Sequence, residues 1–203
     1  MPSYKLTYFK YTGLAEVIRF LLHQSGIQFE DNRLNYTEEW PKVKAQMPMG
    51  QLPVLEIDDK VLYQSKAISR FIAKQNNLYG TDDFEAYEID ATVDTIDDLR
   101  QACTTYYWEQ DPAFKAKLKE TAFQKLPVYL DKLNEQVKKN GGYFVGGKLT
   151  WADLFWAAQS ELISTATDTD LDKDHPELKK LVEKVRALPN IKAYLANRPE
   201  NAI

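Results

Sequence analysis

The sequence predicts an α+β N-terminal domain followed by an all-α C-terminal domain. Strand patterns occur only in the first third of the chain, where short apolar runs alternate with turn residues. A polar, glycine-containing segment at residues 76–83 then precedes a long region in which apolar residues recur at helical spacing. We therefore expect two domains, residues 1–80 and residues 81–203.

The first elements are predicted to be a strand, a helix and a second strand. Residues Tyr4–Phe9 alternate as a strand does, and the apolar residues from Leu14 to Leu22 fall at helical spacing before Gly26. Residues Ile27–Leu34 can form the next strand. This order indicates a βαβ unit with a right-handed parallel crossover.

A hairpin and a helix complete the predicted N-terminal domain. Residues Val54–Ile57 and Val61–Tyr63 flank residues 58–60, which suit a tight turn, and a helix follows from Ser65. The order βαβ then ββα resembles the thioredoxin-like fold. Because the chain has no CxxC pair, such a scaffold suggests binding of a thiol compound instead of disulfide exchange.

The C-terminal region predicts amphipathic helices. An apolar stripe runs from Ala86 to Leu99, while Asp90, Asp94 and Asp97 share another face. The next helical pattern, over residues 114–137, passes through a proline, Pro127, which predicts a kink or a break.

Two further helices are expected nearer the end of the chain. Thr150 at an N-cap with Asp153 three residues later is a variant of the capping box, so a buried helix should start there. The last sizeable helix begins near Leu178 and ends near residues 188–189.

Composition excludes several classes of function. A formal net charge of −4 and a pI near 5.3 argue against a nucleic-acid partner. The N-terminus lacks the pattern of a secretory signal and no window has the apolar length of a membrane span, so we expect a cytoplasmic protein without membrane contact. With one cysteine, Cys103, and two histidines, His23 and His175, neither a metal site nor thiol exchange by the protein itself is indicated.

The segment from Gln51 to Ile72 has the pattern of a small-peptide binding edge. Pro53 forces Leu52 into extended geometry and has no N–H of its own, so backbone groups around it can face a ligand. Gln64 and Ser65 stand where a helix should begin, and the unpaired N–H groups at a helix start suit a carboxylate.

Several motifs in order then resemble one family, the sigma-class glutathione transferases. They are the opening YKLTYF, the segment EEWPKVKAQMPMGQLPVLEID, the Gln64-Ser65 pair, IDATVDTIDDLR and KLTWADLFW. The resemblance covers nearly the whole chain, is strongest to invertebrate members, and extends to the hematopoietic prostaglandin D synthases of the same class. It implies the glutathione transferase fold, glutathione as co-substrate, a homodimer, and a cis peptide bond before Pro53, and we expect no metal requirement.

The resemblance makes Tyr8 the expected catalytic residue, donating its phenol hydrogen bond to the glutathione sulfur. A thiol of pKa ~8.5 is mostly protonated at neutral pH, and lowering that pKa by one to two units takes ~1.4–2.7 kcal/mol. One hydrogen bond to a charged group contributes roughly 1.5–3 kcal/mol, so a single hydroxyl can supply most of it. Without the family motif, Tyr8 would be one of twelve tyrosines packing a strand end.

The resemblance also implies the residues that bind glutathione. Trp40 and Lys44 would serve the glycine end, Gln51 and Leu52 with Pro53 the cysteinyl part, and Gln64 and Ser65 the γ-glutamyl carboxylate. Without the surrounding motifs, a solvated surface charge would be the preferred interpretation of Lys44 and a packing residue that of Trp40. Ser65 can be part of an ordinary helix start and bind an anion at the same time. The full set of expected glutathione-binding residues is Tyr8, Trp40, Lys44, Gln51, Leu52, Pro53, Gln64, Ser65 and Asp98.

Asp98 is the expected partner of the γ-glutamyl amine, reached from the other subunit of the dimer. The neighbouring Asp94 and Asp97 could collect a divalent cation, as in prostaglandin-type relatives, although a solvated acidic face is the preferred interpretation.

The positions that match the electrophile pocket could each also be core residues. Vertebrate prostaglandin synthases of this class carry Arg where this chain has Leu14 and Trp where it has Thr105, which puts a specific prostaglandin isomerase activity in doubt. The matching positions are Phe9, Tyr11, Gly13, Leu14, Thr105 and Phe155.

We therefore expect a detoxifying transferase that conjugates the glutathione thiolate to small hydrophobic electrophiles. Lipid-peroxidation aldehydes and organic hydroperoxides are reasonable acceptors. The alternatives are a glutathione-dependent prostaglandin D isomerase and a non-catalytic ligand carrier or crystallin-like structural protein, which Tyr8, Gln64 and Ser65 disfavour.

Overall fold

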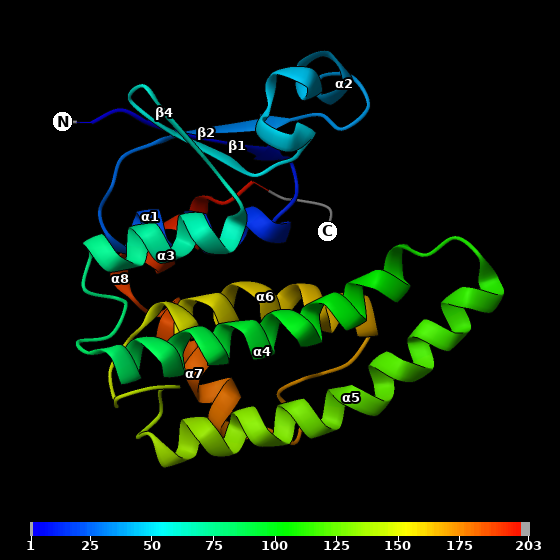
Figure 1. Ribbon diagram of the computed structural model, residues 1–203. Helices are drawn as coiled ribbons and strands as arrows, with labels where there is room; N and C mark the ends of the chain where they lie inside the picture. Colours follow the sequence, from blue (N-terminus) through cyan, green and yellow to red (C-terminus); the bar gives the residue numbers. More distant parts are fainter. Residues whose placement is uncertain (1, 200–203) are drawn as a thin grey trace. The chain divides into compact units, whose positions relative to one another are not determined.

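The computed structural model describes residues 2–199, which pack as two compact units (Figure 1). The first unit spans Met1–Asn76 together with Leu188–Ile203, and the second spans Asn77–Ala187. This division differs from the predicted boundary after residue 80, because the end of the chain packs with the first unit. The fold class is as predicted, with an α+β thioredoxin-like unit and an all-helical one.

A four-stranded sheet with the order β2-β1-β3-β4 organises the first unit. Strand β1 (Tyr4–Phe9) pairs in parallel with β2 (Glu30–Leu34), as the βαβ prediction requires. It pairs antiparallel with β3 (Val54–Ile57), which in turn forms a hairpin with β4 (Lys60–Tyr63). Strand β2 begins at Glu30, three residues later than the predicted Ile27.

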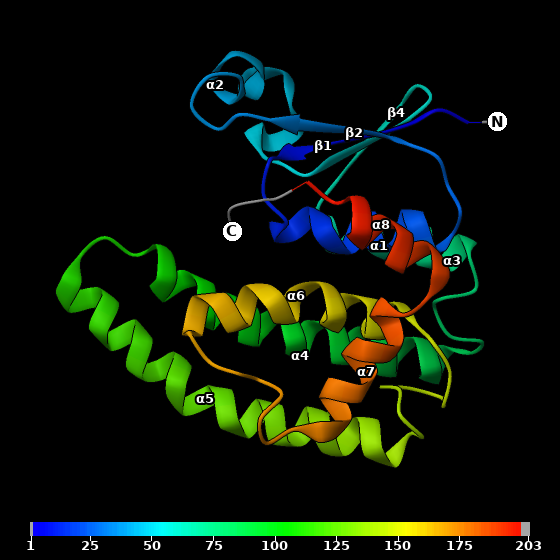
Figure 2. The ribbon, with the colours of Figure 1, turned by 180° about the vertical axis from the view of Figure 1, so that it is seen from behind.

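Three helices cover one face of this sheet (Figures 1 and 2). Helix α1 (Glu16–Gln24) contacts both α3 (Ser65–Gln75) and α8 (Pro189–Asn197). The apolar side chains of α1 that were expected at helical spacing are buried, and so are Leu6 of β1 and Leu55 of β3. The first unit therefore has a core of its own beneath the central strands.

Short helical turns fill the connections of the first unit. A 3₁₀ turn, η1 (Gly13–Ala15), joins β1 to α1. Helix α2 (Trp40–Val43) and the 3₁₀ turns η2 (Lys44–Gln46) and η3 (Pro48–Gly50) connect β2 to β3. These connections carry most of the expected site residues of this unit.

Four helices build the second unit: α4 (Asp83–Trp108), α5 (Pro112–Lys139), α6 (Trp151–Thr167) and α7 (Pro176–Arg186). Helix α4 contacts α5 and α6, and α7 contacts α5 and α6. Helix α6 is buried along most of its length, as its apolar sequence predicts. Among the described residues no helix is both long enough and apolar enough to cross a membrane.

Of the kink or break predicted at Pro127, the break does not occur, because helix α5 continues through this residue. Two other sequence predictions need correction. The sequence predicts a last helix that ends near residues 188–189, but Pro189 occupies the first position of a further helix, α8. Asp97 is 5% exposed and lies 2.7 Å from Arg100 Nε, so the solvated interpretation is wrong for it, although Asp94 is exposed.

The predicted capping box at the start of α6 is present and buried. The Asp153 carboxylate accepts hydrogen bonds from the Thr150 N–H at 2.7 Å and from the Phe144 N–H at 2.9 Å. Burial raises the pKa of Asp153 from 3.8 to about 6, against the opposing effect of these hydrogen bonds. One carboxylate thus joins the start of α6 to the loop before it.

We predict that Asp153→Ala lowers the free energy of unfolding by about 2–3 kcal/mol, because two buried N–H groups lose their acceptor. The pKa of Asp153 is higher in the folded than in the unfolded chain, so its ionisation opposes folding. Its contribution to stability should therefore decline as the pH rises from about 4 to about 6. Urea unfolding of the wild type and the variant at several pH values measures both effects.

The matched control is Asp111→Ala. Asp111 caps α5 by accepting from the Phe114 N–H at 2.7 Å, but it is exposed. Its loss should cost about 1 kcal/mol. Equal losses in the two variants would contradict the importance of burial at Asp153.

Candidate active site

A cavity of about 330 Å³ in the first unit gathers most of the predicted site residues. Its volume falls in the range of small-molecule sites. Residues from the β1–α1 connection, the β2–β3 connection and the start of α3 meet there. The lining residues are Phe9, Leu14, Trp40, Lys44, Pro48, Gly50, Gln51, Leu52, Pro53, Tyr63, Gln64 and Ser65.

One wall of this cavity combines an aromatic pair with a cation. Trp40 is 8% exposed, and its ring meets that of Phe9 edge-on with 5.5 Å between centroids. Lys44 is exposed beside it, one helical turn along the connection. The Trp40 packing fixes the wall, while the Lys44 ammonium can attract an anionic group in solvent.

A second part of the cavity is lined by Leu52 and Pro53, immediately before β3. The Leu52–Pro53 peptide bond is cis, as the resemblance implies. Ladder pairing of β3 begins at Val54, which faces Thr7 of β1 and Tyr63 of β4. The backbone of Leu52 therefore lies before the paired part of the strand, where an extended peptide can align with it.

The start of α3 supplies the third part of the cavity. Gln64 is the N-cap residue, with φ 72° and ψ 106°, and makes no side-chain cap hydrogen bond. A non-glycine residue with positive φ is strained, and such strain concentrates at binding sites. The geometry presents the N-terminal end of an eleven-residue helix, with its Ser65 hydroxyl, to an anion.

Tyr8 lies directly beside this cavity. Its side chain is 8% exposed, and its hydroxyl oxygen accepts a hydrogen bond from the N–H of the cavity-lining Leu14 at 3.2 Å. A phenol oxygen can both accept and donate hydrogen bonds, so this hydroxyl is a group suited to bind a ligand atom beside the cavity.

Gly13 makes room for the Tyr8 hydroxyl. A Cβ at Gly13 would lie 2.6 Å from Tyr8 Oη, and the residue has φ +42°, which L side chains rarely adopt. The turn η1 therefore approaches Tyr8 as closely as it does because this position lacks a side chain.

The remaining predicted site residues do not line this cavity. Tyr11 is partly buried, with its ring 6.3 Å from that of Phe9. Asp98 and Thr105 are exposed on α4 and line one cavity of about 370 Å³ in the second unit. Phe155 is 2% exposed and packs edge-on against Trp151 in the helical core.

Thiol chemistry at this site must come from a bound molecule. Cys103, the one cysteine of the chain, is buried on α4, and burial raises its pKa to about 11. Within residues 2–199, no group of three or more His, Cys, Asp and Glu side chains is placed to hold a metal ion. The cavity thus offers a hydroxyl, a cation, exposed backbone and a helix start to a small anionic peptide.

The sequence analysis missed some of the surroundings of the site. Pro48, Gly50 and Tyr63 line the cavity but were not among the predicted site residues, although Pro48 and Gly50 lie within a motif of the resemblance. Glu16 and Arg19 were also missing from the prediction, although two charged residues three apart in the apolar first part of α1 were a signal. Both are buried, and Arg19 Cζ lies 6.0 Å from the centre of the Tyr8 ring.

Comparison with known proteins gives matches over nearly the whole chain. Residues 4–74 match the family model of the glutathione S-transferase N-terminal domain, and residues 97–198 match that of the C-terminal domain. A glutathione S-transferase of Anopheles gambiae is 44% identical over 98% of both chains. The hematopoietic prostaglandin D synthase of Gallus gallus is 38% identical over the full length of both.

A solved structure described as prostaglandin synthase D of Nilaparvata lugens has the same fold. Its TM-score is 0.92 at 41% identity, over 98% of this chain and 100% of the other. The similarity therefore extends from sequence to structure in both units.

We predict that Gly13→Ala lowers the free energy of unfolding by about 1–3 kcal/mol more than Gly26→Ala. Both glycines have positive φ, so both variants incur backbone strain, but a Cβ at Gly26 meets nothing within 4 Å. Only Gly13→Ala forces the Tyr8 hydroxyl to move. Urea unfolding measures the difference, and a crystal structure of Gly13→Ala with an unmoved Tyr8 would contradict the explanation.

Proposed function

This chain belongs to the glutathione S-transferase family and is a glutathione transferase, and we propose that Tyr8 activates the thiol of its glutathione. The observation that carries the proposal is the position of the Tyr8 hydroxyl, which accepts from the N–H of the cavity-lining Leu14 and is a group that can both accept and donate hydrogen bonds. A hydrogen bond from it to the sulfur would stabilise the thiolate more than the thiol. The thiolate is the form that attacks an electrophile.

The cavity supports one direction for glutathione. Lys44 and the Trp40 indole would bind the glycyl carboxylate, since both can donate to it. The backbone of Leu52 would pair with the cysteinyl part, with Gln51 beside it and Pro53 fixing the turn. Gln64 and Ser65 would hold the γ-glutamyl carboxylate at the start of α3. This direction leaves the sulfur in the middle of the peptide, on the Tyr8 side.

We further propose that the enzyme is a homodimer and that Asp98 binds the γ-glutamyl amine in the neighbouring subunit. Members of this family are typically dimeric. Asp98 is exposed on α4, and large apolar side chains are exposed on the same helix, Phe84 at 83% and Tyr87 at 69%. Exposed apolar residues of this size on one helix support a protein interface.

The proposed acceptors are small hydrophobic electrophiles, such as lipid-peroxidation aldehydes, and organic hydroperoxides are proposed substrates for reduction. The proposed location of the enzyme is the cytoplasm. The electrophile residues in the first unit support these acceptors, because Phe9 and Leu14 give the cavity beside Tyr8 an apolar side. We expect Tyr11, Gly13, Thr105 and Phe155 to contribute to the acceptor site or its support.

Prostaglandin isomerisation is the second candidate function, favoured by the names of the Gallus and Nilaparvata relatives. Leu14 and Thr105 oppose it, because neither can supply the guanidinium or the indole found in the vertebrate synthases. A non-catalytic carrier is less well supported, because it would not need the Tyr8 hydroxyl to activate a thiol or the helix start at Ser65 to bind a carboxylate.

We predict that Tyr8→Phe lowers kcat/KM at neutral pH by roughly 10–100-fold, because the thiol of bound glutathione loses one to two units of pKa depression. The assay uses saturating glutathione with an aryl halide, an unsaturated aldehyde or prostaglandin H2. Activity on the first two alone supports the general transferase, and prostaglandin turnover at a comparable rate supports the isomerase.

Tyr4→Phe is the control, because Tyr4 lies on the same strand at its other end. It should leave all rates unchanged. Equal rates for Tyr8→Phe and the wild type would end the proposed role of Tyr8, and absence of turnover in the wild type would favour a carrier.

We predict that Asp98→Ala raises the KM for glutathione about tenfold with little change in kcat, because an ion pair to the ligand amine is lost. Sedimentation at the assay concentration reports the oligomeric state of the same sample. A dimeric variant with a raised KM supports direct contact. A monomeric wild type, or a KM that is unchanged, would contradict the proposed role of Asp98.

A further inference from the structure

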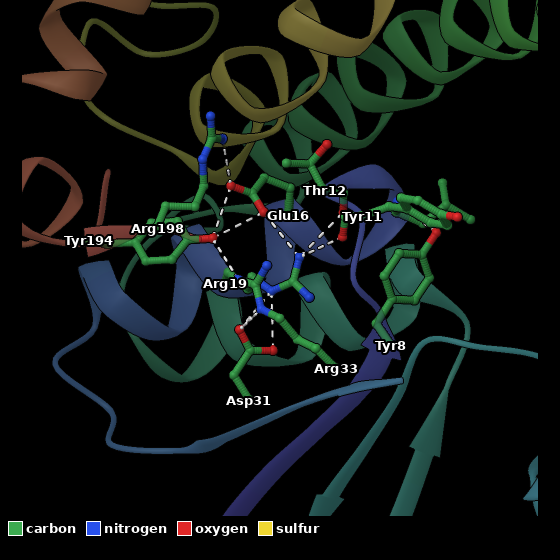
Figure 3. Close-up of polar contacts among 10 residues, drawn as sticks. Tyr8, Tyr11, Thr12, Glu16, Arg19, Asp31, Arg33, Tyr194 and Arg198 are labelled. Carbon is green, nitrogen blue, oxygen red and sulfur yellow. Dashed lines mark hydrogen bonds and ion pairs between the residues drawn. The ribbon is translucent and has the colours of Figure 1, made fainter. Parts of the chain in front are cut away.

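The guanidinium of Arg19 joins the connection after β1 to strand β2 (Figure 3). Its side chain has no exposed surface. Nη1 donates to the carbonyl oxygens of Tyr11 at 3.1 Å and Thr12 at 3.4 Å, while Nε donates to the Asp31 carboxylate at 3.1 Å. One planar group therefore holds two consecutive carbonyls of the β1–α1 connection.

These two carbonyls lie immediately before the residues that position the Tyr8 hydroxyl. Gly13 follows Thr12 and packs against Tyr8 Oη, and the Leu14 N–H donates to that oxygen at 3.2 Å. The Arg19 guanidinium also lies 6.0 Å from the centre of the Tyr8 ring, within the range of a cation–π contact. A shift of the connection would therefore move the hydroxyl or its hydrogen-bond donor.

Glu16 connects Arg19 to the end of the chain. Its carboxylate is 1% exposed and accepts from Arg19 Nη1 at 3.1 Å, from the Tyr194 hydroxyl at 3.0 Å and from Arg198 Nη1 at 3.0 Å (Figure 3). Burial raises the pKa of Tyr194, so it stays a protonated donor at neutral pH. Tyr194 belongs to α8, and Arg198 follows that helix directly.

We propose that Arg19 is a positioning residue for Tyr8 and that α8 keeps it in place through Glu16. The inference rests on the proposed role of Tyr8 in activating the glutathione thiol. The sequence of contacts runs from Tyr194 and Arg198 to Glu16, then to Arg19, and from there through the β1–α1 connection to Tyr8. The C-terminal segment thereby sets how strongly the enzyme activates glutathione.

A guanidinium suits this task better than an ammonium. Its planar group places two donor nitrogens in fixed positions, with Nε toward Asp31 and Nη1 toward the two carbonyls and Glu16, whereas a lysine is a compact charge on a flexible stem. Arg19 does not line the glutathione cavity, so its replacement should affect thiol activation more than glutathione binding.

Two variants test the proposal at different distances from Tyr8. Arg19→Lys keeps the positive charge but loses the planar group with its two donor nitrogens. Arg198→Met removes one hydrogen-bond donor to Glu16, and the Arg198 side chain is 20% exposed. The pKa of the bound thiol, from the pH dependence of thiolate absorbance, should rise by about one unit in Arg19→Lys and half a unit in Arg198→Met. At neutral pH, kcat/KM should fall about tenfold in Arg19→Lys and about threefold in Arg198→Met. The KM for glutathione should be nearly unchanged in both variants.

Lys192→Met is the matched control for charge. Lys192 is exposed on the same helix as Tyr194, so the variant removes a positive charge from α8 without touching Glu16. It should leave the thiol pKa unchanged, whereas Arg198→Lys should restore part of the loss seen in Arg198→Met. A thermal unfolding scan of each variant shows which fraction is folded in the assay.

A double variant separates action through Tyr8 from action on folding alone. If Arg19 works through Tyr8, adding Arg19→Lys to Tyr8→Phe should change kcat/KM less than twofold. Lowered unfolding temperatures with an unchanged thiol pKa and kcat, or full additivity in the double variant, would overturn the proposal. If Tyr8→Phe itself leaves the thiol pKa unchanged, the proposed role of Tyr8 fails, and the positioning role fails with it.

Discussion

The buried ion pair between Glu16 and Arg19 is the constraint on which the first unit depends. Removing two charges from water is unfavourable, and such a pair persists only when further hydrogen bonds satisfy it. Here the additional partners are the carbonyls of the β1–α1 connection, the Asp31 carboxylate of β2, and the donors of α8 and the residue after it. Loss of one partner of a buried pair typically costs about 3–5 kcal/mol, so strand, connection and helix are held in one arrangement.

The cavity beside this ion pair is assembled from connections instead of regular elements. Gly13 and Gln64 have positive φ, and each stands at or immediately before the start of a helical segment, η1 and α3 respectively. Such conformations are retained only where the surrounding structure over-determines them. The sheet and α1 supply that rigidity, and the connections supply the groups that contact glutathione in the proposed complex.

Much of the architecture could be predicted because local signals agreed with the tertiary structure. The alternation in β1, the hairpin around residues 58–59 and the capping box at Asp153 all act over a few residues. At Pro189 the local signal gave a wrong helix end, and at Pro127 it could not separate a kink from a break. Whether a proline interrupts a helix or begins one depends on packing around it, which no short window contains. Asp97 likewise finds Arg100 and Gln101 on its own helix and is buried with them.

The sequence by itself determined the two-part organisation and the family, and it predicted most of the residues that line the cavity of the first unit, because these are indicated by periodicity and by motifs that lie close together in the chain. Only the tertiary structure decided that residues 188–199 pack with the first unit and that Glu16 joins them to Arg19. Glu16 and Arg198 are separated by 182 residues, and Glu16 and Tyr194 by 178. Hydrogen bonds over such separations arise from the packing of complete elements, which local sequence patterns do not encode.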